Sequence, residues 1–190
     1  MINGVNIVQL VDEHDNPIGT MEKMEAHLLP ALHRAVSVLL FNKQGEWLLH
    51  QRAEEKYHCG GLWTNACCTH PYINEKYEDA ARRRLFQEMG IYTSEPFTFI
   101  FDFIYKARLN DNLWEYEYDR VFTCITDIEP EPDPCEVKDW KYISANLLED
   151  DIKNNPQQYT IWFKIILEKL IANYGNLQQV SHQVISKNIK

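Results

Sequence analysis

The sequence lacks long apolar runs, paired cysteine motifs and an excess of positive charge. No stretch approaches the roughly 20 consecutive apolar residues that a membrane-spanning helix requires. The five cysteines are odd in number, form no C-x-x-C pair and follow no secretory signal, which predicts reduced thiols in a cytoplasmic protein. A formal net charge of −9 at pH 7 disfavours nonspecific binding to nucleic acid or to anionic membranes. A few local lysines and arginines can still build a pocket for an anionic substrate.

What the sequence does contain is an ordinary globular composition, with 45% apolar and 25% charged residues. This composition argues against disorder, and 190 residues suffice for one domain with a full core. We expect a single domain over residues 1–175, followed by a polar tail over residues 176–190 that carries no core pattern. The expected assembly is a monomer or a weak homodimer.

Two principal helices are expected from apolar residues at helical spacing. The first covers residues 75–89, with Asn74 as its N-cap and Gly90 just past its end. The second covers residues 157–174. Between and before them lie several strands, so the order of elements predicts a mixed α+β sandwich in which sheets are flanked by helices.

The strands are predicted from alternating or continuous apolar residues. Alternation places the aromatic residues at positions 97, 99, 101, 103 and 105 on one face, and Glu115 and Glu117 together on one face of the next strand. The expected strands cover residues 6–11, 35–41, 46–52, 97–108, 114–125 and 137–143.

Residues 63–71, which read Trp-Thr-Asn-Ala-Cys-Cys-Thr-His-Pro, concentrate more chemistry than any other stretch. Cys68 can hold a transferable proton, His70 can bind a metal ion, and Pro71 fixes the turn that follows. An isolated Cys-x-His is more often a buried strand end with inert thiols. Because adjacent strand residues face opposite sides, only one of Cys67 and Cys68 can enter a site.

Three histidines and two glutamates have the chemistry of a metal site. His27, His33 and His70 fall near strand ends or in loops, and Glu115 and Glu117 share a strand face. Imidazoles with carboxylates suit a borderline divalent ion such as Mn²⁺ or Zn²⁺, with Mg²⁺ bound at lower affinity. Taken singly, each histidine is more often a surface or capping residue, and both glutamates could be solvated. The sequence alone does not bring these groups together.

Several separated motifs follow one another in a specific order. They are Glu22-Lys23 then His27; His33 before an apolar strand; Gln51-Arg52 then Lys56; Trp63-Thr64-Asn65 then Cys68 and His70; Tyr105; Glu115-x-Glu117; and Trp162. With these motifs the chain, over roughly residues 5–170, resembles the type 1 isopentenyl diphosphate isomerases, a branch of the Nudix superfamily. So many matches in order are far more specific than one short motif. The resemblance implies a Nudix-type mixed β-sheet sandwich flanked by helices.

The helix after residue 71 decides between two activities of this superfamily. Its hydrolase signature reads Gly, five residues, Glu, seven residues, Arg-Glu, an aliphatic residue, any residue, Glu-Glu, any residue and Gly. Aligned on the last glycine, the chain keeps Glu75, Arg83, Glu88 and Gly90 but has Thr69, Arg84 and Gln87 in place of the first Gly and two Glu. The loss of two metal-holding carboxylates favours the isomerase over a hydrolase of nucleoside diphosphate derivatives.

The reaction that the resemblance implies is the interconversion of isopentenyl diphosphate and dimethylallyl diphosphate in isoprenoid biosynthesis. Protonating an unactivated alkene creates a tertiary carbocation, so the site needs an acid, a base on the opposite side and no stray water. The resemblance assigns this pair to Cys68 and Glu117, with Tyr105 hydrogen-bonded near the carboxylate and Trp162 facing the cation. On pattern alone, Trp162 serves equally well as a core anchor of the last helix.

The resemblance also implies two metal sites and a pocket for a small allylic or homoallylic diphosphate. His27, His33, His70, Glu115 and Glu117 would hold Mn²⁺ or Zn²⁺. Glu88, with the backbone carbonyl of Cys68, would hold a Mg²⁺ that touches the diphosphate, and the family spacing Cys-x-His favours Cys68 over Cys67. Four cations that could otherwise be solvated surface charges would neutralise the diphosphate: Lys23, Arg52, Lys56 and Arg84. A third interpretation is a noncatalytic, metal-stabilised binding module.

Overall fold

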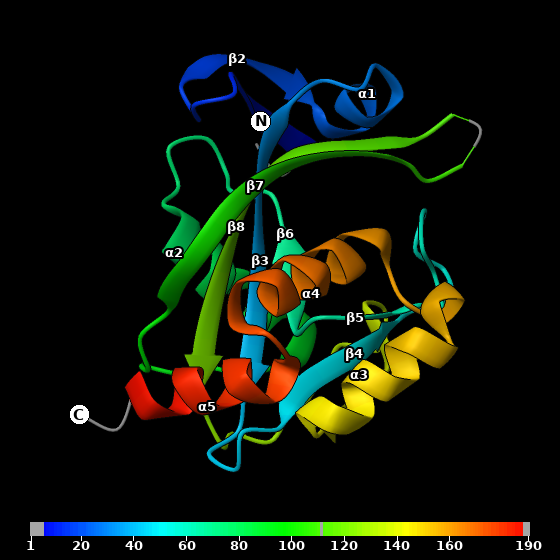
Figure 1. Ribbon diagram of the computed structural model, residues 1–190. Helices are drawn as coiled ribbons and strands as arrows, with labels where there is room; N and C mark the ends of the chain where they lie inside the picture. The colour runs from blue at the N-terminus through cyan, green and yellow to red at the C-terminus, as the bar shows by residue number, and fades with distance from the viewer. Residues whose placement is uncertain (1–5, 111, 188–190) are drawn as a thin grey trace.

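The computed structural model describes residues 6–110 and 112–187 (Figure 1). Its strands are β1 (Ile7–Val11), β2 (Pro17–Glu22), β3 (His33–Phe41), β4 (Trp47–Arg52), β5 (Trp63–Thr64), β6 (Cys67–Thr69), β7 (Thr98–Arg108), β8 (Trp114–Ile125) and β9 (Val137–Ile143). Its helices are α1 (Lys23–Leu28), α2 (Tyr77–Met89), α3 (Ala145–Asn154), α4 (Ile161–Tyr174) and α5 (Leu177–Lys187), with a 3₁₀ turn at Pro156–Gln158. The expected strands and both expected helices are present, and β2 lies where no strand was predicted.

Strand β3 is the strand around which the sheet is built. It pairs in parallel with β8 along its whole length and antiparallel with β6. Its two ends pair with β1 and β4. All of its side chains except that of Arg34 are buried, as expected for a central strand that is covered on both faces.

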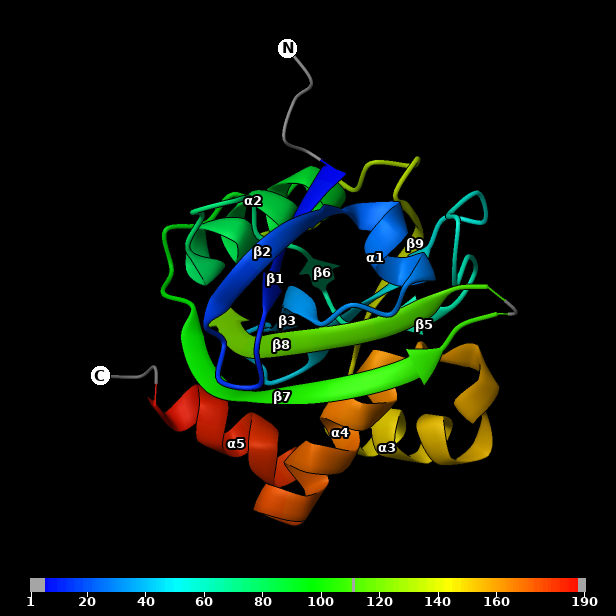
Figure 2. The same ribbon diagram turned by 90° about the horizontal axis from the view of Figure 1, so that it is seen from above.

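Alternate side chains of β3 build two separate cores. Val38 and Leu40 pack with α2, whereas Leu39 and Phe41 pack with α4 and α5. Figures 1 and 2 show α2 on one side of the sheet and helices α3–α5 on the other. The predicted α+β sandwich is confirmed, with five α-helices among the described residues rather than two principal ones. In the same part of the chain, no helix has both the length and the apolarity needed to cross a membrane.

The capping of α2 agrees with the prediction at one end only. Gly90 ends the helix with a φ of 67°, the left-handed conformation expected of a glycine after the last turn. At the other end the N-cap is Lys76, not Asn74. Asn74 has a φ of 65° and belongs to the turn that precedes the helix.

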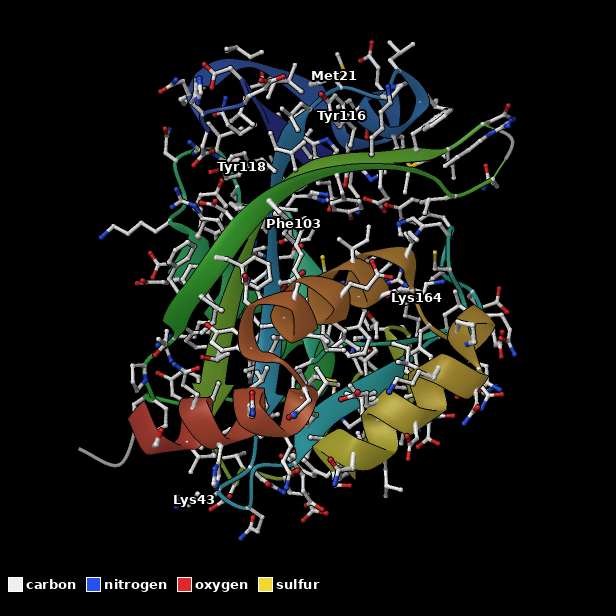
Figure 3. The ribbon with its side chains drawn as sticks, viewed as in Figure 1. Met21, Lys43, Phe103, Tyr116, Tyr118 and Lys164 are labelled. Carbon is white, nitrogen blue, oxygen red and sulfur yellow. The ribbon has the colours of Figure 1, made fainter. Side chains whose placement is uncertain are left out.

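The aromatic residues of β7 do not share one face as predicted. The pairing of β7 with β8 shifts by one residue between Phe99 and Phe101, and such a bulge moves the following side chains to the other face. Phe99 is half exposed, whereas Phe103 and Tyr105 are buried in the core on the α4 side; Figure 3 shows Phe103 between β7 and α4. The shift also places Tyr105 directly opposite Glu117 of β8.

The polar tail expected after residue 175 is wrong for residues 177–187, which form α5. Apolar side chains at helical spacing are buried in the core on the α4 side: Leu177, Val180 and Val184. The indole N–H of Trp47 donates to Ser181 Oγ at 2.9 Å. A few apolar positions among polar residues suffice for an amphipathic helix once a partner surface exists. The last part of the predicted tail, residues 188–190, lies outside the described residues.

Candidate active site

A cavity of about 490 Å³ gathers side chains from α1, the loop between β4 and β5, β6, α2, β7, β8 and α4. Its lining includes every residue predicted to have a catalytic or diphosphate-binding role: Lys23, Arg52, Lys56, Cys68, Arg84, Tyr105, Glu117 and Trp162. Residues more than a hundred positions apart are thereby brought to one space. Their shared location is established, and their individual roles stay predictions.

The five residues predicted to hold Mn²⁺ or Zn²⁺ lie at this cavity, and three of them, His70, Glu115 and Glu117, line it. One ligand atom from each of His27, His33, His70 and Glu117 lies within 4.8 Å of the others. His70 Nε2 is 2.9 Å and His33 Nε2 is 3.7 Å from Glu117 Oε1, while His27 Nε2 is 3.9 Å from Glu115 Oε2. The parallel register of β3 and β8, with His33 opposite Glu117, positions the group.

Backbone hydrogen bonds determine which ring nitrogen two of these histidines direct at the carboxylates. Nδ1 of His27 lies 2.7 Å from the carbonyl of Lys23, and Nδ1 of His33 lies 2.8 Å from that of Ala31. A carbonyl only accepts, so each Nδ1 carries the proton and each Nε2 keeps its lone pair. Among the described residues, His27 Nε2 has no hydrogen-bond partner. Lone pairs that converge beside two carboxylates fit a divalent metal ion.

Burial keeps the imidazoles of His33 and His70 neutral, and the pKa values of Glu115 and Glu117 are shifted in opposite directions. It lowers the pKa of His70 to about 3 and also lowers that of His33. Burial, followed by the charge of Glu117, raises the pKa of Glu115 well above its ordinary value. Burial acts in the same direction on Glu117, but hydrogen bonds with His70 and Glu115 outweigh it and hold the pKa of Glu117 well below its ordinary value. His33 and His70 are therefore neutral beside an ionised carboxylate. The proton that His70 Nε2 donates to Glu117 leaves that nitrogen when His70 binds a metal ion through it, since a ligating imidazole nitrogen must be deprotonated.

The two adjacent cysteines face opposite sides of β6. Cys67 is fully buried in the core beside α2, whereas Cys68 lines the cavity. Cys68 Sγ lies 3.6 Å from the hydroxyl of Ser37, the residue opposite it in the sheet. Burial, followed by the neighbouring Asp119 charge, raises the pKa of the Cys68 thiol well above its ordinary value. Cys68 therefore meets the cavity as a protonated thiol.

Tyr105 of β7 is hydrogen-bonded to the carboxylate of Glu117 on β8. Its hydroxyl donates to Glu117 Oε2 at 2.7 Å, as the resemblance implied, and lies 3.5 Å from Glu115 Oε2. Burial, with the nearby Glu115 and Glu117 charges, raises the pKa of Tyr105 well above its ordinary value. The phenol therefore keeps its proton and holds Glu117 in place. A protonated thiol and an ionised carboxylate can thus both reach a molecule in this cavity.

Cations line another wall of the cavity. Arg84 Nη2 is 2.6 Å from both Glu88 Oε1 and Glu136 Oε2, and Lys56 also pairs with Glu136. Burial lowers the pKa of Lys23, and the charges of Lys56 and Arg84 lower it further. Several cationic side chains at one wall attract a ligand that carries more than one negative charge.

Trp162 fits both interpretations proposed from the sequence. It is only 2% exposed and packs in the core on the α4 side, yet its indole also lines the cavity. The guanidinium of Arg52 lies 5.4 Å from the ring centroid. The indole Nε1 has no hydrogen-bond partner in the part of the chain that the structure describes.

The face of α2 that carries metal-binding carboxylates in the hydrolase signature is different here. Arg84 and Gln87 both line the cavity at the two positions where that signature has glutamate. The guanidinium of Arg84 pairs with Glu88, the carboxylate that is kept. A cation therefore stands where the signature has an anion, which explains in physical terms why this face cannot hold the full hydrolytic metal cluster.

Sequence reasoning missed several polar residues of the site. Asp119 lies 2.8 Å from the Ser37 hydroxyl beside Cys68, and its place two residues beyond Glu117 was a signal that could have found it. Glu136, the partner of Lys56 and Arg84, comes from the loop between β8 and β9, for which no site residue was predicted. His58 comes close to Glu115 from the loop between β4 and β5, and no periodicity marks it.

Comparison with known proteins agrees with this geometry. The NUDIX domain family matches residues 31–163. The chain is 48% identical over 173 residues to isopentenyl-diphosphate Delta-isomerase 2 of Photorhabdus laumondii, which covers 91% of this chain and 96% of that protein. It is 43% identical over 163 residues to isopentenyl-diphosphate Delta-isomerase of Pectobacterium atrosepticum, with 86% and 90% covered.

Solved structures support the fold. The crystal structure of DR0079 from Deinococcus radiodurans superposes with a TM-score of 0.65 at 19% identity, covering 78% of this chain and 90% of that one. The MutT protein from Methanosarcina mazei superposes with a TM-score of 0.60 at 17% identity, covering 75% and 94%. At such identities the likeness concerns the fold alone. Taken with the sequence relatives, it leads to one conclusion: the chain belongs to the Nudix family and, within it, to the isopentenyl-diphosphate Delta-isomerases.

Proposed function

We propose that this protein interconverts isopentenyl diphosphate and dimethylallyl diphosphate, the activity named for its relatives. The observation that carries the proposal is the meeting of Cys68, Glu117 and Trp162 in the cavity that the cations also line. A diphosphate held by the cations leaves its short hydrocarbon chain among the other three side chains. The reaction supplies isomers for isoprenoid biosynthesis.

Cys68 and Glu117 act as the acid and base pair. In the forward direction one of them adds a proton to the terminal CH₂ carbon of the alkene, and the neighbouring carbon becomes a tertiary cation. The other removes a proton from the carbon on the diphosphate side, and the electrons of that C–H bond form the new double bond. Protons and charge balance over the two steps, and no water takes part.

Tyr105 and Trp162 support this pair. Tyr105 orients Glu117 through its 2.7 Å hydrogen bond. The indole face of Trp162 stabilises the positive charge of the intermediate, because an aromatic face attracts a cation strongly where water is excluded. Both side chains are buried at the wall of the cavity.

His27, His33, His70, Glu115 and Glu117 would hold Mn²⁺ or Zn²⁺. Bound there, the ion would supply positive charge that shifts the acidity of Glu117. Glu88 and the backbone carbonyl of Cys68 would hold a Mg²⁺ beside the diphosphate. Support for this second position comes from Glu88 Oε2, which is buried and has no hydrogen-bond partner among the described side chains.

Lys23, Arg52, Lys56 and Arg84 bind the diphosphate. Lys56 and Arg84 are now paired with Glu136, so a diphosphate that binds there competes with a carboxylate that lies close by. This arrangement keeps the cations paired before substrate arrives, and it favours a ligand with more charge than one carboxylate.

The test is proton NMR of isopentenyl diphosphate in D₂O with the metal-loaded protein. We expect deuterium-labelled dimethylallyl diphosphate from the wild type and none on the same time scale from Cys68→Ala or Glu117→Gln. Cys67→Ala is the matched control, since it removes the adjacent thiol that faces the core. A folded, metal-loaded wild type that leaves the substrate unchanged contradicts the proposal, and release of phosphate or pyrophosphate supports the hydrolase instead.

Several narrower expectations stay predictions. They are a cytoplasmic location, a monomer or weak homodimer, and action without nucleic acid. Measuring the mass in solution by light scattering tests the second of these directly.

A further inference from the structure

We propose that His58 is a fourth imidazole ligand of the metal centre and binds through Nε2 beside His27 and Glu115. This inference rests on the metal centre proposed above. It adds a ligand from the loop between β4 and β5. This ligand is not part of the motifs recognised in the sequence.

The His58 side chain is buried, and one of its two ring nitrogens has no hydrogen-bond partner among the described residues. Its side chain is 8% exposed, and its Nδ1 is among the buried atoms that have no partner in the described part of the chain. Its Nε2 lies 3.5 Å from Glu115 Oε1. The atom that faces the other candidate ligands is therefore Nε2, and no hydrogen bond to the described residues engages Nδ1.

The contacts around His58 hold its ring on the cavity side. Arg52 Nη2 donates to the backbone carbonyl of His58 at 3.2 Å. The ring packs edge-on against Tyr57, with centroids 4.3 Å apart, and edge-on against Trp162 at 5.9 Å. His27 stacks on it at 6.2 Å. The loop therefore presents His58 in a fixed orientation, as a ligand requires.

The distances among three of the donor atoms, those of His27, His58 and Glu115, fit a shared ion. Ligand atoms of His27, His58 and Glu115 all lie within 4.8 Å of one another. Around an ion with bonds of about 2.1 Å, neighbouring ligand atoms of an octahedron are about 3.0 Å apart and opposite ones about 4.2 Å. The 3.5 Å between His58 and Glu115 and the 3.9 Å between His27 and Glu115 fall between these values.

The centre holds one ion, not two. Two groups of candidate ligands occur, His27 with His33, His70 and Glu117, and His27 with His58 and Glu115. They share His27, whose Nδ1 proton is bonded to the carbonyl of Lys23, so only Nε2 can bind a metal. One lone pair serves one ion, and the two groups are therefore two sides of one centre. Four imidazoles and two carboxylates favour Zn²⁺, Mn²⁺ or Co²⁺ over Mg²⁺.

The experiment compares Zn²⁺ binding to metal-free wild type, His58→Ala and His58→Gln. A competing chelator gives the affinity, and X-ray absorption at the zinc edge gives the number of imidazole ligands. We expect one Zn²⁺ per wild-type chain with four imidazoles, three imidazoles in both variants, and affinity lowered about tenfold or more. The control is His14→Gln, which changes an exposed histidine of the turn between β1 and β2 and should leave both readouts unaltered.

The possible outcomes separate this inference from the proposed metal centre. Wild type that binds no Zn²⁺ overturns both. Wild type that binds one Zn²⁺ with three imidazoles, unchanged in the His58 variants, overturns only the role of His58, even if the affinity falls. Two ions per wild-type chain overturn the single centre. His58→Ala is checked for folding by circular dichroism. If it is poorly folded, imidazole is added to His58→Gln instead. A restored four-imidazole spectrum then supports the inference, and an unrestored spectrum counts against the inference.

Discussion

Two acidic clusters lie on opposite faces of β3 and β8, and they are neutralised in different ways. On the α2 face, Asp15 is 2.6 Å from Arg34 Nε and 3.2 Å from Arg120 Nη2. On the α4 face, Glu115 and Glu117 have imidazoles as their close partners. Alternation produces the difference, because consecutive residues of β3, a histidine and then an arginine, point to opposite sides of the sheet.

The partners differ in what they offer a carboxylate. A guanidinium is always charged, so the Asp15 cluster is complete within the chain. The imidazoles of His33 and His70 are kept neutral by burial, which lowers their pKa, so they cannot cancel a buried negative charge. The carboxylate that pairs with arginines stabilises the fold without a further ion. The carboxylates that pair with neutral histidines need another cation to balance their charge, as expected of a metal site.

The largest expected effect is a loss of isomerisation activity when an acid of the α4 face is changed, compared with an acid of the α2 face. Glu117→Gln should lower the isomerisation rate by about 10³-fold or more, because it removes a proton-transfer group. Asp15→Asn should leave the rate within about twofold while lowering the melting temperature, since it weakens pairing with two arginines but does not line the cavity. Rates at saturating substrate and thermal melts of both variants give the comparison. Equal losses of rate in the two variants would contradict it.

Metal removal should destabilise one cluster and not the other. An ion present at 100 times its Kd stabilises the folded state by about 2.7 kcal/mol, which for a chain of this size is a melting-temperature rise of roughly 5–10 °C. We expect this rise when Zn²⁺ is returned to chelator-treated wild type. Asp15→Asn should show the same rise from a lower starting temperature, and His33→Ala should lose most of it. A rise that His33→Ala retains in full shows that the ion binds elsewhere.

An arginine that lines the cavity and one that does not should also differ in substrate binding. Arg84→Gln should raise KM for isopentenyl diphosphate by about 10- to 100-fold, because a bond to a charged group contributes about 1.5–3 kcal/mol. The effect of this substitution on kcat should be smaller, because Arg84 is proposed to bind the diphosphate and takes no part in the proton transfers. Arg34→Gln, a matched change at an arginine that does not line the cavity, should alter stability but not KM. Inhibition by inorganic pyrophosphate, weakened only in Arg84→Gln, checks that the lost contact is to the diphosphate.

The local parts of the fold and site could be predicted from the sequence. Strict alternation within β8 placed Glu115 and Glu117 together, and both are buried on one face. The left-handed residue at Gly90 was predicted because only the adjoining turn decides it. The site residues came from the resemblance, since spacing alone cannot state that α1, β3, β6 and β8 meet.

What could not be predicted depends on distant contacts. The bulge in β7 reverses the face of Phe99, and it arises from pairing with β8 rather than from β7 alone. Helix α5 has too few apolar residues to be recognised before the surface that Leu177 covers is known. His58 lies in an irregular loop, where no periodicity relates it to Glu115. In each case the deciding partner is far away in the chain.

The smallest expected effect concerns a second acid paired with arginine, Glu75 on the segment before α2. Arg83 binds both of its oxygens, at 2.7 and 2.8 Å. Burial raises the pKa of Glu75, but the Arg83 bond and the backbone N–H of Tyr72 outweigh this and leave it below its ordinary 4.5. A lowered pKa means that the pair stabilises the fold above pH 4.5 and that this contribution disappears as the pH falls through the folded-state value.

Glu75→Gln should therefore cost about 0.2–1 kcal/mol at pH 7, as partly exposed ion pairs do, and less at low pH. Urea unfolding of wild type and variant at pH 7 and pH 3 measures this difference. The cost at pH 7 should be smaller than that of Asp15→Asn, because Asp15 pairs with two arginines and also accepts a hydrogen bond from Tyr77. A Glu75→Gln cost that is unchanged at pH 3 would show that the contribution comes from packing or neutral hydrogen bonds, and pairing with arginine would then not explain the stability of this face.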